Sequence, residues 1–412
     1  MAPDPDEPTD TTRRRYLASA GALAGSALLA GCQGSGDTTT ATTTDSTTGG
    51  TTDAGTGTTD ANQPYSVSMA PVGEVGFEEP PTNVMVYSLL YADMAVAYGY
   101  GDAVNSLGFS TNAAGSLHAY YDQLDGVSFD QEGLTQLNEG GSGITVDKEV
   151  FYDLNSDLHL IDPALVVSFD GWDIDDVEEI RDNVAPWFGN VLSRRNTEPP
   201  EAYADSYEYY TLWEISEKVA QVFQAQERYD ALAAIHDDVL STIQSNLPPE
   251  SERPTVASVI FIDGTFYPSK FNADGFAHAH TRPMQASGAF AESDVSYQSS
   301  YDYEQMLEVD PDVIVNRYSY SYYDVTSVRQ TLEEDEVGSR LSAVENDRVY
   351  AGGNPLQGPV MNLFQLEMTA KQLYPDVFGE WPGYDGGPYP EIPEEEQLFD
   401  RDEVAAIMNG DL

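Results

Sequence analysis

The chain has 412 residues, of which 70 are acidic and 18 basic, and its formal net charge is −52 at pH 7. A surface this acidic repels a phosphate backbone, so we expect no nucleic-acid partner. The single cysteine, Cys32, excludes a disulfide within the chain. Carboxylates are so frequent that a pair of them says little about catalysis.

The N-terminus has the pattern of an export signal. Arg13 and Arg14 precede the apolar residues 17–29, a segment shorter than the roughly 20 residues of a membrane-spanning helix. Paired arginines before such a segment are typical of the twin-arginine pathway. The run Leu29-Ala-Gly-Cys32 resembles a lipobox, in which Cys32 becomes the lipidated N-terminus; the alternative is an ordinary cleaved signal. We expect residues 1–32 to be this signal, and the protein to be lipid-anchored on the extracellular face of the membrane.

Residues 33–62 consist almost entirely of Thr, Gly, Ser, Asp and Ala. They offer too little apolar surface to offset the entropy of ordering, so we expect a disordered stalk. The acidic composition as a whole resembles that of proteins from extreme halophiles, where the Debye length of roughly 3 Å at 1 M salt screens like charges. An acidic calcium-binding surface protein is the alternative, but no ordered calcium loop is found.

The next segment, residues 63–206, predicts an N-terminal α/β lobe. Short apolar runs predict strands at 83–87, 102–109 and 163–168, and helical spacing predicts helices at 89–98, 146–157 and 174–184. Residues 207–246 keep helical spacing throughout and predict one long linker helix, with a break allowed near residues 225–226.

Residues 247–380 predict a second α/β lobe. Strands are expected at 255–262, 311–316 and 347–350, and helices at 284–290, 303–308, 325–334 and 359–373. Residues 381–412 are expected to form an acidic tail with a short helix at 401–408. The predicted fold is therefore α/β, with two lobes that each hold a mainly parallel sheet flanked by helices and are joined by one long interdomain helix.

Several segments in this order resemble one family. They are residues 158–167 (LHLIDPALVV), the linker pieces 219–223 and 229–232, residues 303–315 (YEQMLEVDPDVIV), and the closing pieces 341–350, 358–360 and 373–378. Their order and spacing are similar to those of substrate-binding lipoproteins of ABC importers for iron-siderophores, haem or cobalamin. The resemblance implies permease and ATPase partners, a membrane contact through the lipid anchor, and no intrinsic cofactor or catalytic residue. The ligand, a ferric chelate or a corrinoid, would lie between the lobes. Residues 111–147 depart from the family, being longer and more polar.

In such a fold the loops that follow the strands hold the ligand. Trp172 offers broad aromatic contact to a ligand. The alternative is a structural role, with its side chain packed under the loop. Arg317 offers a forked donor for an anionic ligand. The candidate ligand-binding residues are Tyr91, Ser110, Trp172, Phe266, Arg317, Tyr318, Tyr320 and Asn354.

Two other functions have weaker support. His278 and His280, with His118 from the first lobe, suggest a site for bare zinc or manganese ions, as in related importers. A secreted surface enzyme is the other alternative, but the chain has no Gly-x-Ser-x-Gly, His-Glu-x-x-His or P-loop motif. A surface adhesin would predict repeats, which are not found. We therefore expect a binding protein and not an enzyme.

Overall fold

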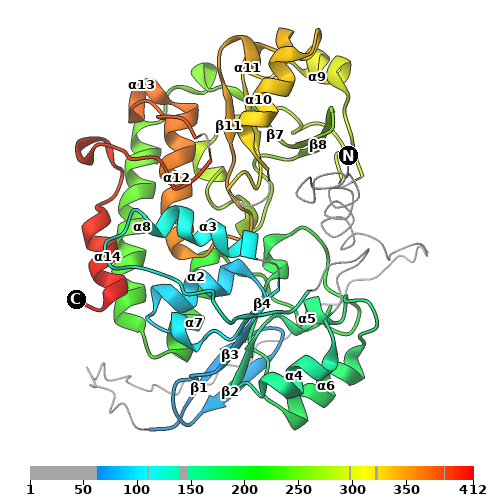
Figure 1. Cartoon of the computed structure of the whole chain (residues 1–412), viewed down its shortest axis with the longest axis vertical. Coiled ribbons are helices and arrows are strands. Elements are labelled where there is room, and N and C mark those ends of the chain that lie inside the picture. The colour runs from blue at the N-terminus through cyan, green and yellow to red at the C-terminus, as the bar shows by residue number, and fades with distance from the viewer. Residues whose placement is uncertain (1–62, 109–110, 139–145, 297, 321–322, 385) are drawn as a thin grey trace, which may run out of the picture.

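The computed structural model describes residues 63–108, 111–138, 146–296, 298–320, 323–384 and 386–412. Figure 1 shows two α/β lobes, one above the other, with helix α8 (Gln226–Asn246) running along one side of both. The predicted fold class is confirmed. Cys32, the signal, the stalk and Ser110 lie outside the described residues.

Lobe 1 is built on short strands. A hairpin of β1 (Tyr65–Met69) and β2 (Gly73–Phe77) is antiparallel. Strand β3 (Val84–Val86) runs parallel to β6 (Leu158–Leu160), and β4 (Ser106–Leu107) runs parallel to β5 (Thr135–Gln136). Single parallel bridges, Val84 to Val104 and His159 to Trp187, extend this parallel arrangement on both sides. The helices of the lobe are α2 (Leu89–Ala97), α3 (Thr111–Tyr121), α4 (Lys148–Leu154), α5 (Pro163–Val166) and α6 (Ile174–Asn183).

The strand predicted at 163–168 is wrong, because these residues form helix α5. Asp162 caps this helix, its Oδ1 accepting from the Ala164 amide at 2.9 Å, and Pro163 occupies the first turn. Proline fits there because the first helical N–H has no intrahelical partner. The strand of this segment lies just before helix α5. It is β6, which is three residues long and fully buried.

The linker predicted as one helix is two helices. Helix α7 (Leu212–Val222) starts with a capping box between Thr211 and Glu214. The chain then turns through Gln224, which has a left-handed φ of 51°, before α8 begins. The break allowed near residues 225–226 is therefore confirmed, and α8 alone runs along both lobes.

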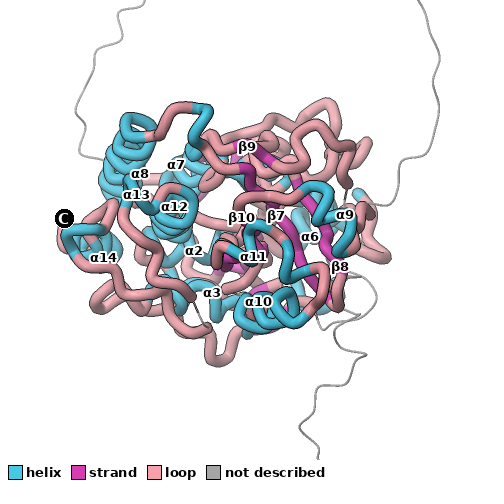
Figure 2. Tube along the Cα trace, turned by 90° about the horizontal axis from the view of Figure 1, so that it is seen from above, coloured by secondary structure: helices cyan, strands magenta, loops and turns pink. Residues whose placement is uncertain are grey.

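Lobe 2 has a mixed five-stranded sheet. Its strands are β7 (Thr255–Ile262), β8 (Thr265–Ser269), β9 (Ser287–Gly288), β10 (Val313–Asn316) and β11 (Val349–Ala351). The order is β11–β10–β7–β8, with β9 also paired to β7, and only β8 is antiparallel to its neighbour. The helices are α9 (Tyr303–Val309), α10 (Val325–Glu334), α11 (Ser342–Glu345), α12 (Pro359–Leu373) and α13 (Pro375–Phe378). Figure 2 shows helices α9, α10 and α11 beside this sheet, and α12 near α8.

The helix predicted at 284–290 is wrong. Gln285 takes a left-handed φ of 50°, which ends a 3₁₀ turn, and Ser287–Gly288 pair with β7 instead. The 3₁₀ turns of the described chain are η2 (Gly101–Ala103), η3 (Leu192–Arg194), η4 (Glu250–Glu252), η5 (Phe276–His278), η6 (Arg282–Met284), η7 (Gly338–Arg340) and η8 (Glu394–Glu396). The helix predicted at 401–408 is confirmed as α14 (Arg401–Asn409). Among the described helices, none combines the length and apolar character needed to cross a membrane.

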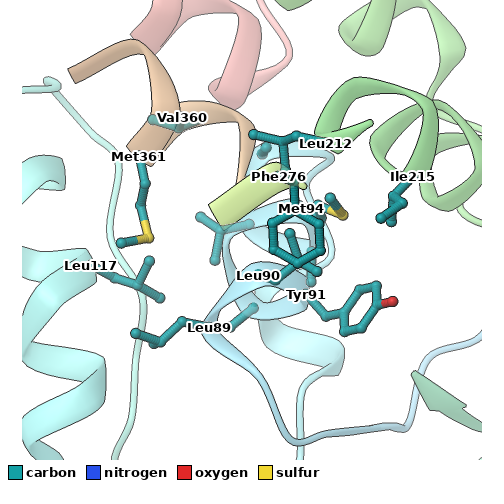
Figure 3. Close-up of a cluster of buried hydrophobic side chains, with 14 of the residues drawn as sticks. Leu89, Leu90, Tyr91, Met94, Leu117, Leu212, Ile215, Phe276, Val360 and Met361 are labelled. Atoms are coloured by element: carbon teal, nitrogen blue, oxygen red, sulfur yellow. The ribbon is translucent and has the colours of Figure 1, made fainter. Parts of the chain in front are cut away.

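One hydrophobic core continues from lobe 1 into lobe 2. Figure 3 shows Phe276 of lobe 2 among Leu90 and Met94 of α2 and Leu212 of α7, with Val360 and Met361 of α12 nearby. Every residue of α12 is buried. A second, smaller core lies within lobe 2, around Phe261, Phe266 and Leu332. The two lobes are thus packed against each other through α2, α7 and α12.

Asp93 is a buried carboxyl at this junction. Its Oδ2 accepts from the backbone N–H of Val360 at 2.9 Å and of Met361 at 3.2 Å, so a lobe 1 side chain caps α12. Its Oδ1 accepts from the Tyr121 hydroxyl at 2.5 Å. Burial raises the pKa of Asp93 from 3.8 to about 6, although these three hydrogen bonds act in the opposite direction.

We predict that Asp93 makes the folded protein less stable as pH rises. The folded state binds the proton more tightly than the unfolded state, so the stabilisation is complete below pH 3.8 and is lost as the pH rises to about 6. The loss amounts to roughly 3 kcal/mol at 1.36 kcal/mol per pKa unit. Asp93→Asn, which keeps the shape without a charge, should flatten the unfolding free energy between these pH values. Urea titrations of both proteins at several pH values measure this; equal slopes would contradict it.

Candidate ligand site between the lobes

A small cavity lies in lobe 2, where β10 and β11 end. Its volume is about 20 Å³, which is room for about one water molecule. It is lined by Ser258, Phe271, Ala277, His278, His280, Thr281, Val315, Arg317, Gly352, Gly353, Pro355, Thr369 and Gln372. This is the carboxyl edge of parallel strands, where open α/β sheets bind ligands.

Arg317 is the charged residue of this cavity. It follows β10 directly, and its backbone N–H donates to Val259 at 2.8 Å. The turn is fixed by the buried Asn316, whose Oδ1 accepts from the Phe261 amide at 2.9 Å and whose Nδ2 donates to Ser319 at 3.1 Å. The Nε atom of Arg317 is buried and has no hydrogen-bond partner among the described residues. A buried donor without a partner is costly, which marks a place where a ligand acceptor would be stabilised.

Two imidazoles face the same cavity. His280 is 5% exposed, and its Nδ1 lies 2.8 Å from the Gln357 amide nitrogen. Burial lowers the pKa of His280 to about 3 and that of His278 to about 4, with the Arg317 charge adding to the effect on His278. Both rings are therefore neutral at pH 7. The Nδ1 of His280 accepts from Gln357, so its Nε2 carries the proton and can donate. The part of the chain that the structure describes holds no group of three or more His, Cys, Asp or Glu side chains placed to bind a metal ion.

The cavity lies close to lobe 1. The turn η5, which carries His278, contacts η3 of lobe 1. Gly275 enters this turn with a φ of 95°, and a Cβ atom there would lie 2.4 Å from the Arg194 carbonyl oxygen. Only glycine permits this approach. The turn that carries the lining residue His278 is thus held tightly against lobe 1.

The structure brings some of the predicted residues together here. Arg317 lines the cavity, and its guanidinium lies 5.9 Å from the ring centre of Tyr318. Asn354 lies between the lining residues Gly353 and Pro355, with its Oδ1 accepting from the Leu356 amide at 2.9 Å.

Tyr320 lies at a different contact between the lobes. Its ring stacks on Tyr120 of α3, with centroids 5.2 Å apart, and packs against Tyr384 at 4.0 Å. The hydroxyls of Tyr120 and Tyr320 are buried without a hydrogen-bond partner in the described chain. These rings close the lobes against each other on the side of α3.

Three predicted residues lie away from the cavity. Tyr91 is in the core of lobe 1 (Figure 3), its hydroxyl accepting from the Asn190 amide at 2.6 Å. Trp172 donates to the Val146 carbonyl at 2.7 Å and packs edge-on against Phe151; its segment follows helix α5 and not a strand. Phe266 is fully buried in the core of lobe 2.

Sequence reasoning missed Gln357, Thr281 and Tyr120. Gln357 donates to the Phe276 carbonyl at 3.1 Å and contacts His280, so it fixes η5. Thr281 donates to the Phe271 carbonyl at 2.7 Å. A glutamine or threonine in a loop has no pattern that marks it, whereas Tyr120 falls in the long polar segment already noted as unusual.

The molecule thus has two α/β lobes packed together, one helix running along both, and a small cavity at the carboxyl edge of the lobe 2 sheet. Residues 94–356, more than half of the chain, match the model of the periplasmic binding protein family. The chain therefore belongs to this family. No curated protein matches the chain.

Solved structures share the fold. The petrobactin-binding protein YclQ of Bacillus subtilis is 16% identical, with a TM-score of 0.53, over 76% of this chain and 99% of its own. The iron uptake substrate-binding protein PiuA of Streptococcus pneumoniae is 16% identical, with a TM-score of 0.51, over 73% and 96%. CeuE of Helicobacter pylori, solved with Ni(II) bound, is 13% identical, with a TM-score of 0.51, over 76% and 90%.

Proposed function

We propose that this protein binds an anionic metal chelate of the ferric-siderophore type between its lobes and delivers it to an ABC importer. The observation that carries this proposal is the buried, unpartnered Nε of Arg317 at the carboxyl edge of β10. A guanidinium pairs well with carboxylate or catecholate oxygens. The neutral His280 adds a second donor beside it, because its Nδ1 accepts from Gln357 and its proton is therefore on Nε2. YclQ, which has the same fold, is a petrobactin-binding protein.

A chelate is much larger than the present cavity of about 20 Å³. Binding therefore requires η5 to move away from η3, so that the lobe 2 cavity opens toward lobe 1. A corrinoid is the second candidate ligand, but a positively charged cavity wall favours the more strongly anionic chelate. In this proposal the ligand is cargo, the permease and ATPase subunits are the partners, and no catalytic residue is needed.

Titration calorimetry of the full chain tests the proposal in molar salt. The probes are a ferric catecholate, a ferric hydroxamate, haemin, cobalamin, Zn²⁺ and Mn²⁺. We expect one ferric chelate per chain to bind and the bare ions not to bind. Tight binding of Zn²⁺ or Mn²⁺ alone would favour a histidine metal site, and turnover of an added chelate would indicate an enzyme.

We also propose that Cys32 carries a lipid that holds the protein outside the cell, after export by the twin-arginine pathway. The support is the run Leu29-Ala-Gly-Cys32 behind the arginine pair Arg13 and Arg14. Cys32→Ser should move the protein from the membrane fraction to the medium, because one chain end loses its only membrane contact. Immunoblots of both fractions measure this. Equal membrane retention of the serine variant would contradict the anchor.

A further inference from the structure

We propose that the described part of the C-terminal segment, residues 381–384 and 386–412, is a strap that fixes lobe 1 to lobe 2. This segment leaves lobe 2 after α13 and ends in α14. Figure 1 shows it, in red, along the outer side of α8 and α12 and away from β8. The inference does not depend on which ligand the protein binds.

Tyr389 contacts both lobes. Its backbone N–H donates to the Ala119 carbonyl of α3 in lobe 1 at 2.6 Å. Its hydroxyl donates to the Glu367 carboxylate of α12 in lobe 2 at 3.0 Å. The ring is 1% exposed and packs edge-on against Phe364 of α12. One buried residue of the tail thus connects the two lobes.

The strap is held to α12 by a buried charge pair. Glu367 is fully buried and forms an ion pair with Arg401 at the start of α14, while its Oε2 accepts from the Leu398 amide at 2.7 Å. The Arg401 guanidinium also lies over the rings of Phe399 and Phe364, at 3.9 and 4.4 Å from their centres. Leaving either charge buried without its partner is unfavourable, so the strap is attached most firmly at this pair.

The far end of the strap returns to lobe 1. Helix α14 contacts α8 and α2, with Ile407 and Met408 buried in the shared core. Asn409 donates to the Asp125 carbonyl, in the turn after α3, at 3.0 Å. Arg228 of α8 donates to the Met408 carbonyl at 2.9 Å. The tail therefore holds α3, α8 and α12 together.

This arrangement sets where the lobes can separate. Opening on the α3 side would break the bonds of Tyr389 and Asn409 and expose the buried face of α14. The contact between η5 and η3 on the cavity side involves no part of the strap among the described residues. The lobes should therefore open at the cavity while the α3 side stays closed, with α14 docked in every functional state.

Distances between two spin labels on the full chain test the strap. Labels go on cysteines that replace Glu178 in α6 and Glu333 in α10, both exposed, in a Cys32→Ser background. We expect the parent protein without ligand to show only the distances that opening at the cavity allows, and these are the reference. Ile407→Asp, which undocks α14, should add a population at longer distance. Glu403→Gln, on the exposed face of the same helix, is the matched control and should leave the distances unchanged.

Circular dichroism shows whether each variant is folded. If Ile407→Asp does not fold, the milder double variant Ile407→Ala with Asn409→Ala takes its place in the distance measurement. A folded undocked variant with the parent's distances would overturn the strap.

Discussion

Replacing Arg317 by alanine is expected to weaken binding of the ferric chelate by about 100-fold or more. The guanidinium lies in the cavity wall, with its buried Nε unpaired in the described chain, so a ligand oxygen there gains a charge-assisted hydrogen bond. Because Nε makes no hydrogen bond with any described residue, removing this side chain should have little effect on the melting temperature. Titration calorimetry of the parent and the variant measures both affinities.

Two further variants sharpen this result. Arg317→Lys keeps the charge but not the planar guanidinium fork. Its affinity for the chelate should therefore fall between that of the parent protein and that of Arg317→Ala. Arg181→Ala removes an exposed arginine of α6 in lobe 1 and should leave the affinity unchanged. Unchanged affinity in a folded Arg317→Ala protein would show that the ligand lies elsewhere.

Glu367→Gln is expected to lower the free energy of unfolding by roughly 3–5 kcal/mol. The glutamine can still accept from the Leu398 amide, but the buried guanidinium of Arg401 loses its counter-charge. The second change Arg401→Met removes that uncompensated charge, so the double variant should recover part of the loss. Urea unfolding, followed by circular dichroism at constant salt, gives the free energies.

The exposed pair Arg181–Asp182 is the control for this measurement. Arg181→Ala should change the unfolding free energy by less than about 1 kcal/mol, because solvent screens exposed charges. If Glu367→Gln is as mild as this control, the tail is not attached to α12 through the charge pair. The proposed attachment of the strap to lobe 2 through Glu367 and Arg401 would then be wrong.

The sequence predicted lobe 2 better than lobe 1, for a physical reason. Strand β7 and helices α10 and α12 have the predicted bounds, because each is long enough to show its periodicity. In lobe 1 the strand β6 has three residues, too few to show a period, and the apolar run after it belongs to a capped helix. A short apolar run alone does not distinguish a buried strand from a buried helix.

The same errors explain which candidate residues lie away from the cavity. Arg317 was predicted because it follows β10, a strand correctly predicted, and the structure brings it to the cavity. Trp172 was selected on the strand that proved to be helix α5. Phe266 was assigned to a loop, but Asp263 and Gly264 both take positive φ and form a tight hairpin turn, so Phe266 lies within β8. His278 and His280 reach the cavity through a tertiary contact that the sequence does not encode locally.

Native mass spectrometry, with an absorbance spectrum, of the protein purified from the cells that make it naturally tests the central claim most directly. We predict one chelate molecule per chain, with the visible absorption of a ferric complex. The Arg317→Ala variant should be purified without this chelate. A chain that carries only a bare metal ion would contradict the claim that this protein binds a chelate between its lobes.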